Sequence, residues 1–122
     1  MSLSITIPIR IESEANLREH HMAKARRVKK QREAVAWAFK TVSCEDKLNA
    51  IAPLMVQPLS ITLTRIAPRV LDSDNCQRGF KAVRDQIAQE LGINDGDEKA
   101  ATWEYRQRKG KAKEYAVQIS IE

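Results

Sequence analysis

The sequence lacks several of the features by which protein classes are recognised. Its 122 residues contain only two cysteines, too few for a disulfide scaffold, and Cys44 and Cys76 have no zinc-ligand spacing to His20 or His21. No apolar run approaches the roughly 18 residues of a spanning helix, and the amino terminus lacks the basic-then-apolar order of a signal peptide. We therefore expect a cytoplasmic protein, in a reducing compartment and with no membrane partner.

Glycine and proline are scarce as well, with four of each, while 43% of the residues are hydrophobic. This composition is typical of an ordered globular chain, and its length fits a single domain over 1–122. Basic residues outnumber acidic ones by 21 to 16, and the formal net charge of +5 favours a polyanionic partner such as nucleic acid. A chain this short would gain burial from dimerisation.

Hydrophobic periodicity predicts the first elements. Strict alternation over 4–11 indicates a strand, and Pro8 places it at a sheet edge or leaves that position unpaired, because proline donates no ladder hydrogen bond. A helical period over 17–40 predicts a long helix with a strongly basic outer surface. Alternation over 58–66 predicts a second strand with one buried face.

The second half of the chain predicts another helix and a hairpin. The helix over 73–91 begins after the cap-forming Asp72 and ends at Gly92, with Asp74 and Lys81 on its outer face. Two alternating stretches on either side of 109–111 indicate a hairpin. The order strand, helix, strand, helix, hairpin predicts an α+β (mixed α/β) fold, in which a mixed sheet packs against two helices. The aromatic residues expected in its core are Trp37, Phe39 and Trp103.

Acidic side chains are the main candidates for chemistry. Asp72 and Asp74, spaced by two at the entry to a helix, can point into one cavity, and Asp95 or Asp97 could supply a third carboxylate. Magnesium prefers such hard oxygen ligands, and a bound ion can activate water and stabilise a developing phosphate charge. Lys81 is the candidate for contacting the scissile phosphate.

Each of these features also has a purely structural interpretation. Asp72 and Asp74 can serve only as helix caps. Lys81 and Asp85 can form an ordinary i,i+4 ion pair, and residues 94–97 can form a turn. An EF-hand loop beginning at Asp72 is excluded, because its sixth and twelfth positions hold glutamine and valine where glycine and glutamate are needed.

Taken together, the motifs resemble the RusA family of Holliday-junction resolvases. That family carries D-x-D-N, then K-A-x-x-D on the following helix, then G-V or G-I before an acidic doublet. The corresponding segments here are 72–75 (DSDN), 81–85 (KAVRD) and 92–97 (GINDGD). The resemblance extends to the amino-terminal strand, an asparagine in a short loop, and basic residues that open a helix, here Asn16, Arg18, His20 and His21.

The resemblance implies a homodimeric, often phage-encoded, structure-selective endonuclease that cuts Holliday junctions or related branched DNA. Its metal residues would be Asp72, Asp74 and either Asp95 or Asp97, holding Mg²⁺ or alternatively Mn²⁺, with Lys81 needed for cleavage. Two departures leave alternatives open. The step from Asp74 to Lys81 is a few residues longer than usual, so Arg78 competes for the lysine's role, and Gly96 splits the acidic doublet.

Basic residues elsewhere are candidates for contacts with DNA phosphates, although a solvated basic helix face is a common alternative. The candidates are Arg18, His20, His21, Arg26, Arg27, Lys29, Lys30, Arg65, Arg69, Arg78, Arg106, Arg108, Lys109 and Lys111. A second hypothesis is a non-catalytic basic nucleic-acid-binding phage or prophage protein, in which the aspartates serve only as caps and solvated groups. Dependence of DNA cleavage on magnesium separates the two.

Overall fold

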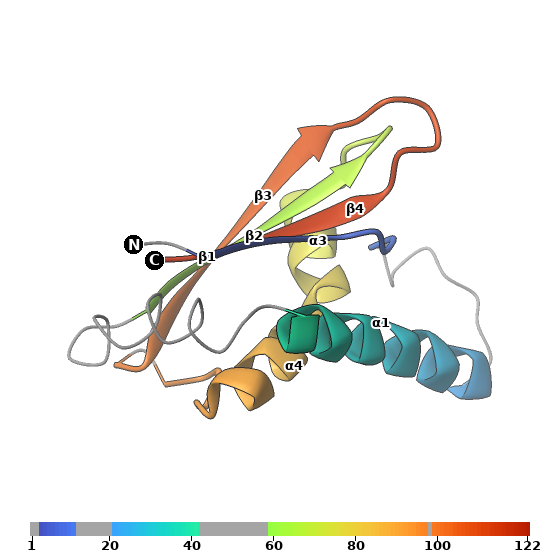
Figure 1. Cartoon of the computed structure of the whole chain (residues 1–122). Coiled ribbons are helices and arrows are strands. Elements are labelled where there is room, and N and C mark those ends of the chain that lie inside the picture. Colours follow the sequence, from blue (N-terminus) through green and yellow to red (C-terminus); the bar gives the residue numbers. More distant parts are fainter. Residues whose placement is uncertain (1–2, 12–20, 42–58, 98) are drawn as a thin grey trace.

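The computed structural model describes residues 3–11, 21–41, 59–97 and 99–122. Its elements are β1 (Leu3–Ile7), α1 (His21–Thr41), β2 (Leu59–Ala67), α3 (Ser73–Gly79), α4 (Lys81–Leu91), β3 (Ala101–Lys109) and β4 (Ala116–Ile121). The strands form one mixed sheet, and the helices lie on one side of it (Figure 1). The predicted α+β class is confirmed. Within these ranges, no helix has the length and apolar character needed to cross a membrane.

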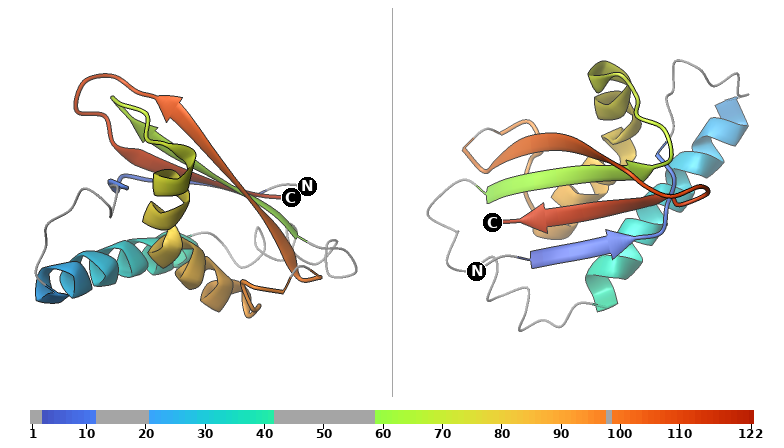
Figure 2. Two further views of the ribbon diagram at one scale, coloured as in Figure 1. Left: turned by 180° about the vertical axis from the view of Figure 1, so that it is seen from behind. Right: turned by 90° about the horizontal axis from the view of Figure 1, so that it is seen from above.

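The sheet has the order β1-β4-β2-β3, which Figure 2 shows from above. Strand β4 pairs antiparallel with both β1 and β2, whereas β2 and β3 run parallel. Parallel neighbours need a long crossover connection, and α3 and α4 supply it. Strand β1 lies at an edge of the sheet, one of the two alternatives expected, but it ends at Ile7, so the strand predicted over 4–11 is too long and Pro8 follows it.

The predicted hairpin is wrong, because β2 lies between the last two strands. The chain leaving β3 passes the carboxyl end of β2, where the Gly110 N–H donates to the Ala67 oxygen at 2.8 Å. Alternation identified both strands correctly. It could not identify their neighbours, because the same one-sided burial arises whichever strand lies alongside.

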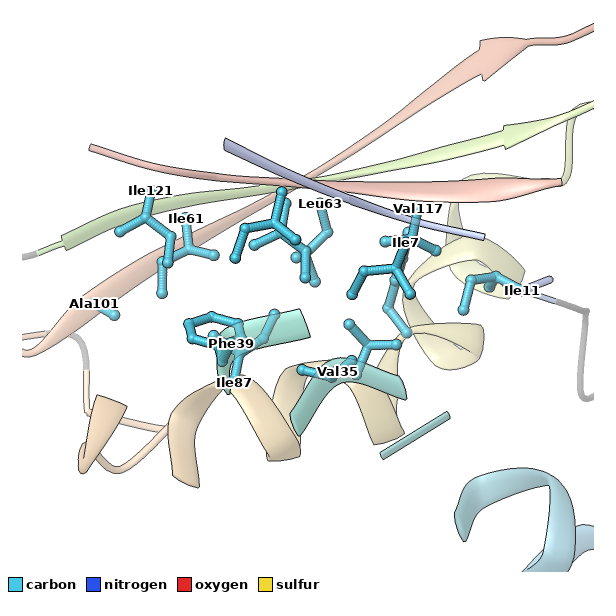
Figure 3. Close-up of a cluster of buried hydrophobic side chains, with 14 of the residues drawn as sticks. Ile7, Ile11, Val35, Phe39, Ile61, Leu63, Ile87, Ala101, Val117 and Ile121 are labelled. Carbon is cyan, nitrogen blue, oxygen red and sulfur yellow. The ribbon is translucent and has the colours of Figure 1, made fainter. Parts of the chain in front are cut away.

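One face of the sheet packs against the helices and forms the core (Figure 3). On β2, Leu59, Ile61 and Leu63 are buried and the residues between them are not, as the alternation requires. The largest fully buried side chains come from both layers and include Phe39, Phe80, Ile61, Leu63, Ile87 and Ile119.

Trp37 is a correction to the expected core, because its side chain is 69% exposed. It stands two residues from both Val35 and Phe39, which are buried, and two residues on a helix are about 200° apart. Trp37 therefore points away from the side of α1 that faces the sheet. Of the other two expected aromatics, Phe39 is buried and Trp103 packs partly buried against the core.

The single helix predicted over 73–91 is divided into α3 and α4 at Phe80. The Phe80 ring is fully buried, with its centroid 5.9 Å from that of Tyr105. Gly79, a weak helix former, directly precedes it and is also buried. The predicted stop is confirmed, since Gly92 ends α4 in the left-handed conformation with φ 69°.

Helix α1 is anchored to the core by its carboxyl-terminal half, while its amino-terminal half extends beyond the sheet (Figures 1 and 2). Arg32 joins it to α4, with Nε donating to Gln86 Oε1 at 2.9 Å and Nη2 to Gln89 Oε1 at 2.8 Å. The predicted helical residues 17–20 lie outside the described ranges.

Candidate functional site

Asp72 and Asp74 stand at the start of α3, and both side chains are exposed. Asp72 occupies the cap position, yet its side chain makes no capping hydrogen bond, and only its backbone oxygen accepts the Cys76 N–H at 2.9 Å. Within the described ranges no cation forms an ion pair with either carboxylate. Asp72 therefore does not perform the capping role that the sequence left open. Asp74 lies in the first turn, where a negative charge favours the helix slightly.

Gln107 fixes the residue that precedes this carboxylate pair. Its Oε1 accepts the Leu71 N–H at 2.8 Å, and its Nε2 donates to the Leu71 oxygen at 2.7 Å. Two reciprocal hydrogen bonds thus attach the start of the 72–74 segment to β3. The sequence analysis missed Gln107, because a contact across 36 positions leaves no periodic signal.

Asp95 and Asp97 belong to a turn that hydrogen bonds hold in place. Asn94 Oδ1 accepts the Gly96 N–H at 3.0 Å, and Asp97 Oδ1 accepts the Lys99 N–H at 3.0 Å. These are the bonds by which asparagine and aspartate side chains stabilise turns. The turn expected over 94–97 as the structural alternative is confirmed.

Arg84 holds Asp95 from α4, and the sequence analysis missed this role. Its Nε lies 3.1 Å from Asp95 Oδ2, although this nitrogen has no acceptor in hydrogen-bonding geometry, so the contact is an ion pair only. Its Nη2 donates to the Asp95 oxygen at 2.7 Å, and its Nη1 to the Tyr105 hydroxyl at 2.7 Å. The guanidinium also lies over the Trp103 ring, 4.7 Å from its centroid.

The four aspartates consequently form two separate pairs. Leu71, next to Asp72, contacts Gln107 near the carboxyl end of β3, whereas the Asp95 oxygen accepts the Trp103 indole N–H near the amino end of that strand. Over the ranges that the structure describes, no three His, Cys, Asp or Glu side chains form a group that could hold a metal ion. The expected convergence of all four carboxylates on one ion is therefore not found there, and magnesium binding stays a prediction.

Lys81 begins α4 and is exposed, with no described acid paired to it. It lines a cleft of about 300 Å³ between α1 and α4 together with Lys24, Gln31 and Asp85. Because the helix divides at Phe80, Asp74 and Lys81 lie on different helices, and the expected common helix face is a correction to the sequence analysis.

Most of the predicted DNA-contact residues are exposed or partly so. On α1, Arg26, Lys29 and Lys30 are exposed and Arg27 is half-buried, with Lys29 Nζ 3.9 Å from Glu33 Oε1. Exposed side chains elsewhere are Arg69, Arg78, Arg106, Arg108, Lys109 and Lys111. Arg18 and His20 lie outside the described residues, as does the side chain of His21.

Arg65 is a correction, because only 6% of this residue is exposed. Its Nε donates to the Ile11 oxygen at 2.9 Å, and its Nη1 to the Arg69 oxygen at 2.6 Å. Burial lowers the pKa of this guanidinium and raises the pKa of the nearby Cys76 thiol. Arg65 therefore joins the segment after β1 to the segment after β2, where its burial leaves little of it open to DNA.

Comparison with known proteins adds no relative: no family model matches the chain, and no curated protein matches its sequence. The RusA family therefore stays a resemblance carried by the motifs at 72–75, 81–85 and 92–97.

Proposed function

We propose that this protein is a magnesium-dependent endonuclease that cuts branched DNA such as Holliday junctions. The proposal is carried by the exposed carboxylates of Asp72 and Asp74, which no described capping bond or ion pair uses. Apart from the slight favourable effect of the Asp74 charge on the first turn of α3, these two carboxylates have no described role in the fold. A role toward a cation is the simplest alternative.

The chemistry of this pair suits magnesium. Protein sites commonly bind Mg²⁺ through one or two carboxylates, with waters and substrate phosphates completing the octahedron. Asp72 and Asp74 would supply the protein ligands, and Mn²⁺ would be accepted in the same place. When bound, the ion would lower the pKa of a water and stabilise negative charge on the phosphate. Asp97 stays a candidate further ligand, whereas the Asp95 carboxylate is already engaged by Arg84.

The substrate class is supported by the charge on α1. The amino-terminal half of this helix extends beyond the sheet (Figure 1). Its Arg26, Lys29 and Lys30 side chains are exposed. Cations so placed can bind DNA phosphates and release their counterions. Lys81 lies across the neighbouring cleft from this helix, where it could contact a phosphate of the same strand. The proposal also includes a homodimer, which the resemblance implies, and a cytoplasmic location, which the small number of cysteines favours.

A cleavage assay tests the activity. We expect the protein to nick a labelled synthetic four-way junction in Mg²⁺, to stop on addition of a chelator, and to resume when excess Mg²⁺ is restored. A linear duplex of the same sequence is the control substrate, and it should be cut far more slowly. No product at any Mg²⁺ or Mn²⁺ concentration would contradict the nuclease proposal.

The second candidate function is a non-catalytic nucleic-acid-binding protein. It is favoured by the separation of the two aspartate pairs and by the turn and ion pair that engage the second of them. In that case the protein would bind DNA in a salt-sensitive manner, and Mg²⁺ and chelator would leave both binding and substrate unchanged.

Both functions require phosphate contacts by α1, and a charge variant tests these. We expect Arg26→Ala combined with Lys30→Ala to weaken DNA binding for all sequences alike. The slope of log affinity against log salt concentration should fall by about 2, because each phosphate contact contributes about 0.9. Lys99→Ala removes an exposed charge in the turn before β3 and is the matched control. An unchanged slope in the α1 variant would show that this helix does not contact DNA.

A further inference from the structure

Trp37 is the most exposed large hydrophobic side chain in the described part of the protein, with 69% of its surface open to solvent. Tryptophan is usually well buried, because its indole carries a large apolar surface. Among the described residues, neither an aromatic ring nor a cation packs on this indole, and its N–H has no hydrogen-bond partner. The ring is therefore available to a ligand that can cover it.

The side chains around Trp37 on the outside of α1 are charged. At 100° per residue, four exposed residues lie within about 60° of Trp37 around the helix axis. With Trp37 they form the outer stripe of α1, which consists of Arg26, Lys30, Glu33, Trp37 and Lys40. At 1.5 Å per residue this stripe is about 21 Å long. Its three cations pair with no described acid, whereas Glu33 Oε1 lies 3.9 Å from Lys29 Nζ. The outer stripe therefore places one aromatic ring among unpaired positive charges.

The chemistry of the outer stripe favours one class of partner. A second copy of the protein would bring like charges together, which is costly. A membrane surface binds a helix whose apolar face is free to enter the lipid, but the apolar side of α1 is buried against the sheet through Val35 and Phe39. Single-stranded nucleic acid fits both features of the stripe, because its phosphates attract the cations and every base has a flat face that stacks on an aromatic ring.

We propose that Trp37 stacks on an unpaired base of the DNA substrate, while cations of the outer stripe bind phosphates on either side of that base. Lys40 lies on one side of Trp37 along the helix, and Lys30 and Arg26 lie on the other. Inside a duplex the neighbouring base pairs cover both faces of a base, so only an unpaired base can stack in this way. Unpaired bases occur where the strands of a branched DNA part. This inference rests on the proposed function and adds to it a preference for unpaired nucleotides.

Fluorescence anisotropy with three labelled ligands in chelator tests the proposal without cleavage. The ligands are a single-stranded oligothymidine, an abasic strand of the same length, and a long paired duplex. The first two carry the same phosphates and differ only in their bases. We expect the wild-type protein to bind oligothymidine about tenfold more tightly than the abasic strand, as for one stacked base. Trp37→Ala should abolish this difference and leave the affinities for the abasic strand and the duplex unchanged.

Alanine suits the test because the position is exposed and alanine is the best helix former, so the variant should melt no lower than wild type. Trp37→Phe should keep part of the preference, since a smaller ring still stacks. Val70→Ala removes another exposed hydrophobic side chain, outside α1, and is the matched control that should keep the full preference. A base stacked on an indole quenches its fluorescence. Oligothymidine should therefore lower the emission of the wild-type protein but not that of Trp37→Phe, in which Trp103 is the only remaining tryptophan.

Two outcomes separate the inference from the proposed function. If the wild-type protein binds DNA but does not distinguish oligothymidine from the abasic strand, only the stacking role of Trp37 is refuted. If it binds no DNA at all, the proposed function fails and the inference fails with it. Equal weakening of all three ligands by Trp37→Ala would also overturn the inference. So would a dimer in sedimentation that Trp37→Ala converts to a monomer, or binding to vesicles of anionic lipid that this variant loses, because the ring would then contact a second copy or a membrane.

Discussion

Asp74→Asn is expected to lose cleavage of a four-way junction by at least about 100-fold while keeping or improving its affinity for that junction. On the proposed function, the substitution would remove a charge that binds the cation, and it would also remove a negative charge facing the DNA phosphates. Asp72→Asn should behave in the same way. The two measurements are the single-turnover cleavage rate in Mg²⁺ and the dissociation constant in chelator.

The exposure of Asp74 makes this variant interpretable. Its carboxylate has no described ion pair, so the variant should lose only a few tenths of a kcal/mol from the first turn of α3. Glu122→Gln makes the same acid-to-amide change at an exposed position outside the proposed site, and should cut normally. Full cleavage by Asp74→Asn in Mg²⁺ would remove this aspartate from the site.

Amide substitution cannot test whether Asp95 is a metal ligand. Its carboxylate pairs with Arg84, which also contacts Tyr105 and Trp103, so amide substitution would disturb the packing of α4 on β3. A loss of cleavage would then have a structural explanation that does not involve metal. Of the second aspartate pair, Asp97 is the more informative position, because the one described hydrogen bond of its carboxylate is to a backbone N–H that an asparagine oxygen can also accept.

Local patterns in the sequence predicted most of the elements. Alternation identified the strands, because a sheet with one buried face repeats every two residues. Gly92 marked the end of α4, because its left-handed conformation carries little penalty only in glycine. The break at Phe80 was missed: Gly79, the weak helix former that precedes it, was not read as a signal, and the contact of Phe80 with Tyr105 is distant in the sequence.

The candidate site was less predictable, because it depends on which segments meet. The spacing of Asp72 and Asp74 could be read directly, but the distance from them to Asp95 depends on the crossover between parallel strands. The pairing of the strands determines that distance, and the sequence pattern had predicted a hairpin of the last two strands in place of the parallel pair of β2 and β3. Because of its charge, Arg65 was likewise predicted to be an exposed cation. It lies two residues after the buried Leu63 of β2, however, and so shares the buried face of that strand.

Arg65→Met is the stability prediction with the largest expected effect, a loss of about 3 kcal/mol in the free energy of unfolding. Methionine fills much of the same volume but leaves the Ile11 and Arg69 oxygens without their donor, and the first of these bonds is buried. For a domain of this size, the melting temperature should fall by about 10 °C. Thermal unfolding followed by circular dichroism measures it.

Arg69→Ala is the matched control, because it removes an exposed arginine side chain and retains the backbone oxygen that Arg65 binds. It should change the melting temperature by no more than about 2 °C, as surface substitutions usually do. The contrast distinguishes an arginine that the fold requires from one that it does not require, within five residues of one chain. Were Arg65→Met to melt like wild type but bind DNA more weakly, Arg65 would be a ligand contact after all, and the segments after β1 and β2 would not depend on it for their attachment.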